Sequence, residues 1–79
     1  MITIRDTDKE IVQKVTKVAT EYSLTNREGE ILTFLLRGYD ARKISLILDI
    51  SKETVRVHIK SIYRKCEVSS HVELLSHLN

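Results

Sequence analysis

No proline occurs anywhere in the chain, and the only glycines are Gly29 and Gly38. Average proteins contain about 7% glycine and 5% proline. Sheets with many tight turns depend on both residue types, because those turns need their backbone conformations. With 79 residues there is room for one modest core. We therefore expect an all-α fold, a compact helical bundle.

Start signals for helices recur along the sequence. Residues 7–10, 25–28 and 70–73 each match a capping box, in which a Ser or Thr is followed three residues later by Glu. Asp40 and Ser51 are further candidate N-caps, and Gly38 can take the left-handed position after a helix. These signals predict helices over about 8–21, 26–37, 41–48, 52–66 and 71–78. The segment 22–24 is the one candidate hinge and separates an N-terminal extension, 1–23, from a domain, 24–79.

Apolar residues at helical spacing mark the face of each expected helix that points to the core. The predicted core faces are Ile11, Val15, Val18 and Tyr22; Ile31, Leu32, Leu35 and Leu36; Ile44, Ile47 and Leu48; and Val55, Ile59, Ile62 and Cys66. The apolar residues of the last helix are Val72, Leu74, Leu75 and Leu78. Between the third and fourth helices there is room only for a tight turn. A short helix, a tight turn and a longer helix is the pattern of a helix-turn-helix motif.

Positive charge is concentrated in the fourth expected helix. Residues 52–65 contain five basic side chains against the single acid Glu53, a net charge of +4, whereas the whole chain carries +2. On a helical projection Arg56, Lys60 and Arg64 lead away from the core face, and Val57 lies in the middle of the outward face. A valine can contact a thymine methyl group and Arg or Lys can donate to guanine, so the face suits the major groove of DNA. A solvated basic face is the alternative reading of the same pattern.

Several motifs at fixed spacing are similar to those of the LuxR-type (GerE/NarL-like) DNA-binding domain. They are LTNREGEIL at 24–32, LLRG at 35–38, TVRVHI at 54–59 and IYRK at 62–65. The resemblance covers residues 24–78. It implies a four-helix core, to which the helix within 1–23 is an addition.

The resemblance also implies a function and its residues. It implies a sequence-specific regulator of transcription that inserts helix 52–66 into the major groove of double-stranded DNA, as a homodimer on an inverted repeat. The positions that resemble base-contacting residues are Arg56, Val57 and Lys60. Those expected at the sugar-phosphate backbone are Ser51, Lys52, Thr54, His58, Arg64 and Lys43. Those expected at the dimer contact are His71, Val72, Leu74, Leu75 and Leu78.

The chain departs from the family pattern at a few positions. Lys43 stands where a glutamate is usual, which replaces an internal ion pair with a candidate phosphate contact. Cys66 replaces a leucine of the core face, so we expect a buried thiol. Gly29 lies inside a helix, where glycine costs about 1 kcal/mol relative to alanine. A close contact with another helix is the one reason the sequence offers for it.

Other functions have less support in the sequence. A helical module that docks to RNA polymerase or to a sensor partner is the alternative, because the first helix, 8–21, is not required by the DNA-binding family. We expect no enzyme, no cofactor and no small-molecule site, since phosphate loops and paired catalytic acids are missing. Cys66 and the three histidines lack the spacing of a zinc site. Apolar stretches are too short to span a membrane and no signal segment follows Met1, so we expect a cytoplasmic protein.

Overall fold

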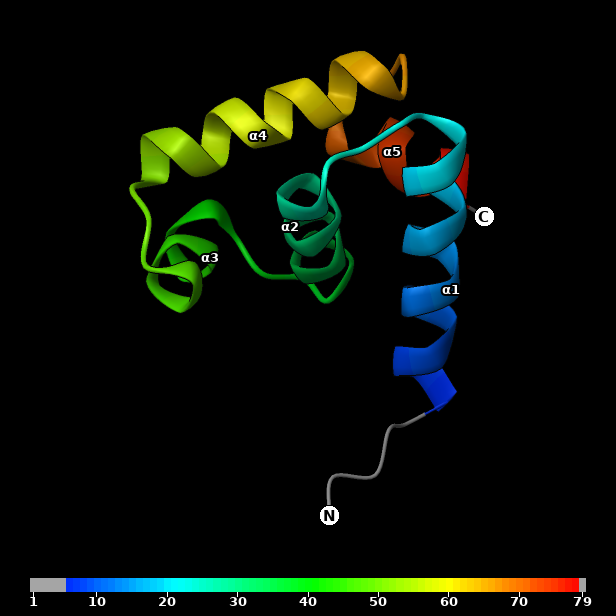
Figure 1. The fold of residues 1–79 in the computed structure, drawn as a ribbon, viewed down its shortest axis with the longest axis horizontal. Helices are drawn as coiled ribbons and strands as arrows, with labels where there is room; N and C mark the ends of the chain where they lie inside the picture. Colours follow the sequence, from blue (N-terminus) through cyan, green and yellow to red (C-terminus); the bar gives the residue numbers. More distant parts are fainter. Residues whose placement is uncertain (1–5, 79) are drawn as a thin grey trace.

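Residues 6–78 fold into five α-helices joined by short connections (Figure 1). The structure, a computed structural model, describes the backbone of residues 6–78 and the side chains of residues 9–76. The helices are α1 (Asp6–Glu21), α2 (Asn26–Leu36), α3 (Ala41–Leu48), α4 (Lys52–Lys65) and α5 (His71–Leu78). Every regular element within the described residues is helical. This confirms the predicted all-α bundle.

Three of the predicted N-caps are confirmed by their hydrogen bonds. The Thr25 hydroxyl accepts from the Glu28 amide at 3.1 Å, and the Thr25 amide donates to the Glu28 carboxylate at 2.8 Å, which completes the capping box of α2. Asp40 accepts from the Lys43 amide at the start of α3. Ser51 does the same for Thr54 at the start of α4. Each cap satisfies a first-turn amide that has no partner inside the helix.

The ends of two helices differ from the predicted ones. α1 begins at Asp6, so the backbone of Thr7 already belongs to its first turn, and the side chain that the predicted box at 7–10 depends on lies outside the described residues. At α5 the Ser70 hydroxyl accepts from the Glu73 amide, but the Glu73 carboxylate accepts from the amide and hydroxyl of Ser69. The predicted box at 70–73 is therefore only half formed, because the carboxylate finds two donors one residue earlier.

Helix ends without proline are made by residues in the left-handed backbone region. Gly38 follows α2 with a φ of +87°, as predicted. Asp49 ends α3 with a φ of 56° and its amide donates to the Ser45 carbonyl. Ser23 and Glu67 take the same conformation after α1 and α4. The non-glycine residues carry a modest backbone cost there, which the packing of the joined helices offsets.

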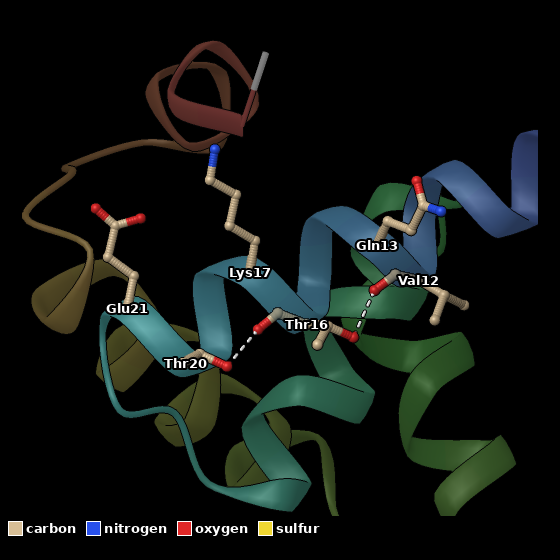
Figure 2. A pocket seen from close by; sticks show the side chains of 6 residues that line it. All are labelled: Val12, Gln13, Thr16, Lys17, Thr20 and Glu21. Carbon is tan, nitrogen blue, oxygen red and sulfur yellow. Dashed lines mark hydrogen bonds between the residues drawn. The ribbon is translucent and has the colours of Figure 1, made fainter.

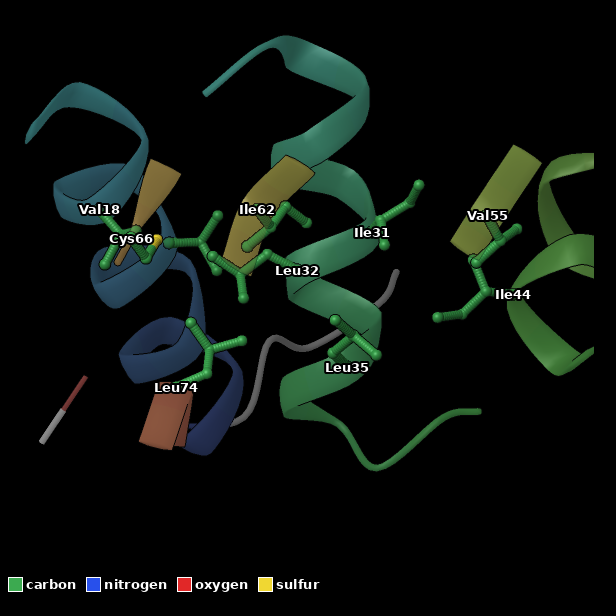
Figure 3. Close-up of a cluster of buried hydrophobic side chains, with 10 residues drawn as sticks. Val18, Ile31, Leu32, Leu35, Ile44, Val55, Ile62, Cys66 and Leu74 are labelled. Atoms are coloured by element: carbon green, nitrogen blue, oxygen red, sulfur yellow. The ribbon is translucent and has the colours of Figure 1, made fainter. Parts of the chain in front are cut away.

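α2 is the central helix of the bundle. It lies between α3 and α1, and α4 crosses over one end of it (Figure 1). Figure 3 shows Ile31 pointing from α2 toward Val55 and Ile44, while Leu32 points the other way, toward Ile62 and Leu74. Both α2 side chains are completely buried. One helix thus fixes α4 along most of its length.

The core contains most of the predicted apolar faces. The buried hydrophobic residues are Val15, Val18, Ile31, Leu32, Leu35, Ile44, Val55, Ile62, Cys66 and Leu74. Leu36, Leu48 and Ile59 are partly buried against them. The prediction for Ile47 is wrong, because its side chain is 48% exposed. α3 is only two turns long and buries one narrow side around Ile44, so the neighbouring apolar position remains in solvent.

α1 packs on the bundle and shares its core. Val15 and Val18 are 8% and 5% exposed, and Ile11 and Tyr22 pack beside them. Gly29 on α2 faces this helix, and a Cβ added there lies 3.9 Å from Val15 Cγ1. That is an ordinary van der Waals distance. The close helix contact expected from the sequence therefore does not require glycine.

Candidate nucleic-acid interface

One face of α4 is held in the core and the opposite face is in solvent. Val55 and Ile62 have no exposed surface, and Cys66 just after the helix is 1% exposed. Val57 is 64% exposed, and Arg56 and Lys60 are exposed beside it. The three sequence-predicted base readers thus lie together on one open surface. α4 has 14 residues and a length of about 21 Å, which fits along a major groove.

The residues expected at the DNA backbone are spread around this surface. Lys52, Thr54 and Arg64 are exposed on α4, and His58 is half-buried. Ser51 and Thr54 bond to each other through their hydroxyl groups at 2.8 Å, so they first serve as the cap of α4. Lys43 lies apart on α3, where its Nζ sits 4.3 Å from the centre of the Tyr39 ring.

An ion pair between a buried carboxylate and a partly exposed lysine joins α4 to the start of α2. Lys65 Nζ donates to Glu28 Oε1 at 2.7 Å and to the Ser23 carbonyl at 3.4 Å. Glu28 is only 3% exposed. The same carboxylate holds the Thr25 amide in the capping box, so one acid ties together the loop before α2, α2 itself and the end of α4.

The pKa of the Glu28 carboxyl is lowered from 4.5 to about 2. Burial alone raises it, because a charged carboxylate loses solvation. Hydrogen bonds from Lys65, Ser61 and the Thr25 amide, together with the charge of Lys65, outweigh that effect. Glu28 is thus a stable anion inside the fold, and Lys65 neutralises it.

This pair was not predicted from the sequence. Lys65 contributes to the positive charge of the fourth helix in the sequence, whereas in the structure its charge is paired with that of Glu28. A signal was present, since Glu28 stands at the helical spacing of Ile31, Leu32 and Leu35 and so lies on the apolar face. A carboxylate at such a position needs a buried partner. Nothing local names Lys65, because it lies 37 positions further on.

A cleft of about 650 Å³ opens beside the outward face of α4, toward the first turn of α2. Val57, His58, Lys60 and Arg64 line it on the α4 side. Thr25 lines it on the α2 side, and the Glu28–Lys65 pair forms part of its wall. Because the pair is neutral overall, Lys60 and Arg64 give the cleft a positive charge.

The residues expected at a dimer contact do not all reach the surface of α5. Val72 is 72% exposed and Leu75 is 36% exposed, and His71 is exposed as well. Leu74 has no exposed surface and packs into the core, so its side chain cannot contribute to a contact with a second chain. The side chain of Leu78 lies outside the described residues.

The outer face of α1 carries a second surface depression (Figure 2). Its lining residues all come from α1, among them Val12, Thr16 and Thr20. The two threonine hydroxyls donate to carbonyl groups of their own helix. Among the described residues no other helix lines this depression, so it is an exposed surface of α1 there.

Neither a metal cluster nor a membrane span is found among the described residues. No three His, Cys, Asp or Glu side chains of that part of the chain gather in a way that could hold an ion. No helix within it is long and apolar enough to cross a bilayer.

Comparison with known proteins places the chain in a family. Residues 22–78 match the model of the GerE family, described as bacterial regulatory proteins of the luxR family. The chain is 44% identical over 63 residues to the response regulator protein TodT of Pseudomonas putida, covering 78% of this chain and 28% of that protein. It is 38% identical over 68 residues to the response regulator protein TmoT of Ectopseudomonas mendocina, covering 85% and 31%.

A third relative is also a response regulator. The nitrate/nitrite response regulator protein NarL of Escherichia coli is 40% identical over 50 residues, which cover 63% of this chain and 23% of that protein. The chain spans less than a third of the length of these relatives. No solved structure matches it significantly. With a helix-turn-helix, an open basic face on α4 and the family match, the chain belongs to the luxR family of bacterial regulatory proteins, whose helix-turn-helix domain binds DNA to regulate transcription.

Proposed function

We propose that this chain reads a specific DNA sequence by placing the outward face of α4 in the major groove. The observation that carries the proposal is the exposure of Val57 among exposed cations on a helix whose other side is anchored in the core. Arg56 and Lys60 act as donors to base edges, and Val57 contacts a thymine methyl group. Ser51, Lys52, Thr54, His58 and Arg64 contact the sugar-phosphate backbone and fix the register.

Lys43 contacts phosphate in the same proposal, from the first helix of the helix-turn-helix motif. In such motifs that helix crosses the DNA backbone while the second helix reads the groove. The cation–π contact with Tyr39 holds the ammonium group in place at the surface. Residues 24–79 form the DNA-binding domain, and the extension 1–23 completes its core through α1.

We further propose that two copies bind an inverted repeat through α5. Val72 and Leu75 supply apolar surface for this contact, with His71 beside them. A helix-turn-helix dimer needs its two reading helices about 34–36 Å apart, one turn of DNA. Sedimentation of the chain alone and with a duplex carrying two half-sites tests this, and a Val72→Asp variant that still forms the same dimer contradicts the α5 contact.

We propose that exposed apolar side chains on α3 form a contact surface for RNA polymerase. Leu46 is 74% exposed on α3, and Ile47 lies next to it. Leu46 lies about 200° around α3 from the buried Ile44, so its side chain is directed away from the core. The chain acts in the cytoplasm in this proposal, where promoter DNA and polymerase meet. A Leu46→Ser variant should bind DNA normally and lose transcription activation in a purified system.

The protein-interaction module without DNA binding was suggested by the first helix. The apolar side of that helix is already buried in the core through Val15 and Val18, so no second protein is needed to cover it. Fluorescence anisotropy with a random-sequence duplex separates the two functions. DNA binding predicts an affinity that falls steeply with salt, because cations on α4 release counterions from phosphates. Failure to bind at micromolar protein and low salt contradicts DNA reading.

A further inference from the structure

The cleft between α4 and the first turn of α2 has no role in base reading by α4 as proposed above. Its α4 wall includes Val57 and Lys60, which also belong to the face proposed to enter the groove. The cleft therefore opens directly onto the edge of that groove. A DNA strand that borders the groove on this side has to pass over it.

The chemistry of the cleft favours a phosphate group. Lys60 and Arg64 lie one helical turn apart on its α4 wall, and His58 lines it as well. The only carboxylate in the wall is that of Glu28, which is 3% exposed and bonded to Lys65 at 2.7 Å. An anion entering the cleft thus meets two uncompensated cations and no uncompensated acid.

The opposite wall offers a hydroxyl donor. Thr25 is exposed, and its Oγ1 accepts a hydrogen bond from the Glu28 amide at 3.1 Å. Accepting that bond leaves the hydroxyl hydrogen free to donate outward. The first-turn carboxylate that could repel an anion is the same Glu28, and it is turned inward.

We propose that the cleft binds one phosphodiester of the DNA backbone between Arg64 on α4 and the Thr25 hydroxyl on α2, while Lys60, whose ammonium group reads a base, adds positive charge on the same wall. This rests on the proposed reading of DNA by α4 and extends the interface beyond the helix-turn-helix motif. The Glu28–Lys65 pair makes the site possible, since it removes the acid from the cleft and fixes the distance between its walls. α2 thereby sets the register in which α4 meets the bases.

The test places a negative charge in the cleft without removing a helix cap. Asp caps helices as well as Thr does, so Thr25→Asp keeps the start of α2 and changes only the charge and the donor. Ser70→Asp is the matched control, because it makes the same kind of change at the N-cap of α5, away from the cleft. Asn26→Asp is a second variant, which places the charge at the residue after Thr25, beside the cleft, where an acid in the first turn favours the helix. Thermal melts monitored by circular dichroism verify that all three fold.

Binding to a duplex with one half-site is then measured against salt concentration. We expect Thr25→Asp and Asn26→Asp to weaken binding about tenfold or more at low salt. The slope of log affinity against log salt should fall by about 0.9, the loss of one phosphate contact. Ser70→Asp should stay within about twofold of the unchanged chain. If folded Thr25→Asp and Asn26→Asp bind like Ser70→Asp with an unchanged slope, the phosphate site is wrong while DNA reading stands. If the unchanged chain does not bind DNA at all, both proposals fail.

Discussion

At the scale of single residues, Glu28 and Lys65 show how a charge inside a small core can serve a surface. Their charged atoms lie 2.7 Å apart and link α2 to α4, the helix proposed to read DNA. A buried pair is costly to break, because the remaining charge loses both water and partner. The pair therefore holds α4 in one position relative to α2. It also makes the stability of the fold sensitive to acid.

The pKa of Glu28 predicts how stability changes with pH. Its carboxyl titrates at 4.5 when exposed and at about 2 in the fold, so the folded state binds fewer protons than the unfolded state between these values. The contribution is complete above about pH 4.5 and is lost as the pH falls toward 2. A difference of this size corresponds to about 3 kcal/mol. Urea unfolding followed by circular dichroism from pH 6 to pH 2 measures it.

Glu28→Gln provides the comparison for that experiment. It should be less stable by roughly 3 kcal/mol at neutral pH and should lose most of the dependence between pH 4.5 and 2. Glu30→Gln is the control, because its partner Arg27 is exposed and surface pairs contribute about 0–1 kcal/mol. Equal acid sensitivity in the unchanged chain and Glu28→Gln contradicts the assignment.

Cys66 predicts a thiol that does not react in the folded chain. Burial raises the pKa of the thiol, and the charges of Glu28 and Glu21 raise it further, so little thiolate forms at neutral pH. Its side chain is only 1% exposed. A chromogenic disulfide reagent should react slowly with the native protein and rapidly in denaturant. Rapid stoichiometric reaction under native conditions is the contrary result.

At the scale of elements, local signals in the sequence predicted the helices well. Caps at Thr25, Asp40 and Ser51 and the turn at Gly38 depend on neighbours a few residues apart, which a sequence displays directly. The predicted core failed at Ile47, where helical spacing is right but α3 buries too narrow a side. It missed Glu28–Lys65, because pairing across 37 positions is decided by how α4 crosses α2.

The sequence also predicted which side chains of α4 are exposed, but it did not predict how the neighbouring helices shape the surface around them. Spacing alone placed Val57 and Arg56 outward, and both are exposed. The cleft toward Thr25 was not predictable, because it exists only once α2 and α4 are packed. The same is true of Leu74, whose burial removes it from the α5 contact expected from the family resemblance.

Replacing each glycine with alanine should change the stability of the fold in opposite directions. Gly29→Ala should stabilise the fold by about 0.5–1 kcal/mol, because Gly29 is inside α2 and an added Cβ meets Val15 only at 3.9 Å. Gly38→Ala should destabilise it by about 1 kcal/mol or more, since its φ is +87°. Thermal or urea unfolding of the two variants measures both. A destabilised Gly29→Ala shows that α1 and α2 pack more closely than in this structure.

At the scale of the whole molecule, the residues that form the core are separate from the face of α4 proposed to read DNA. α1, α2 and α5 contribute to one core, while the outward face of α4 takes no part in it. Val18→Ala on α1 should therefore lower stability by about 1–3 kcal/mol through the cavity it leaves. The DNA affinity of the folded protein should not change. A loss of affinity at temperatures where the variant is fully folded contradicts this separation.

The central claim is that Arg56 and Lys60 on α4 read bases. Selection from a random DNA pool gives the preferred site, and anisotropy titrations of the unchanged chain, Arg56→Ala and Lys60→Ala on that site test the claim. Lys9→Ala on α1 is a control for the loss of one exposed cation. We predict a loss of about 1–3 kcal/mol for each α4 variant, a relaxed preference at one base pair, and little change for Lys9→Ala. Unchanged affinity and sequence preference in both α4 variants contradicts the account.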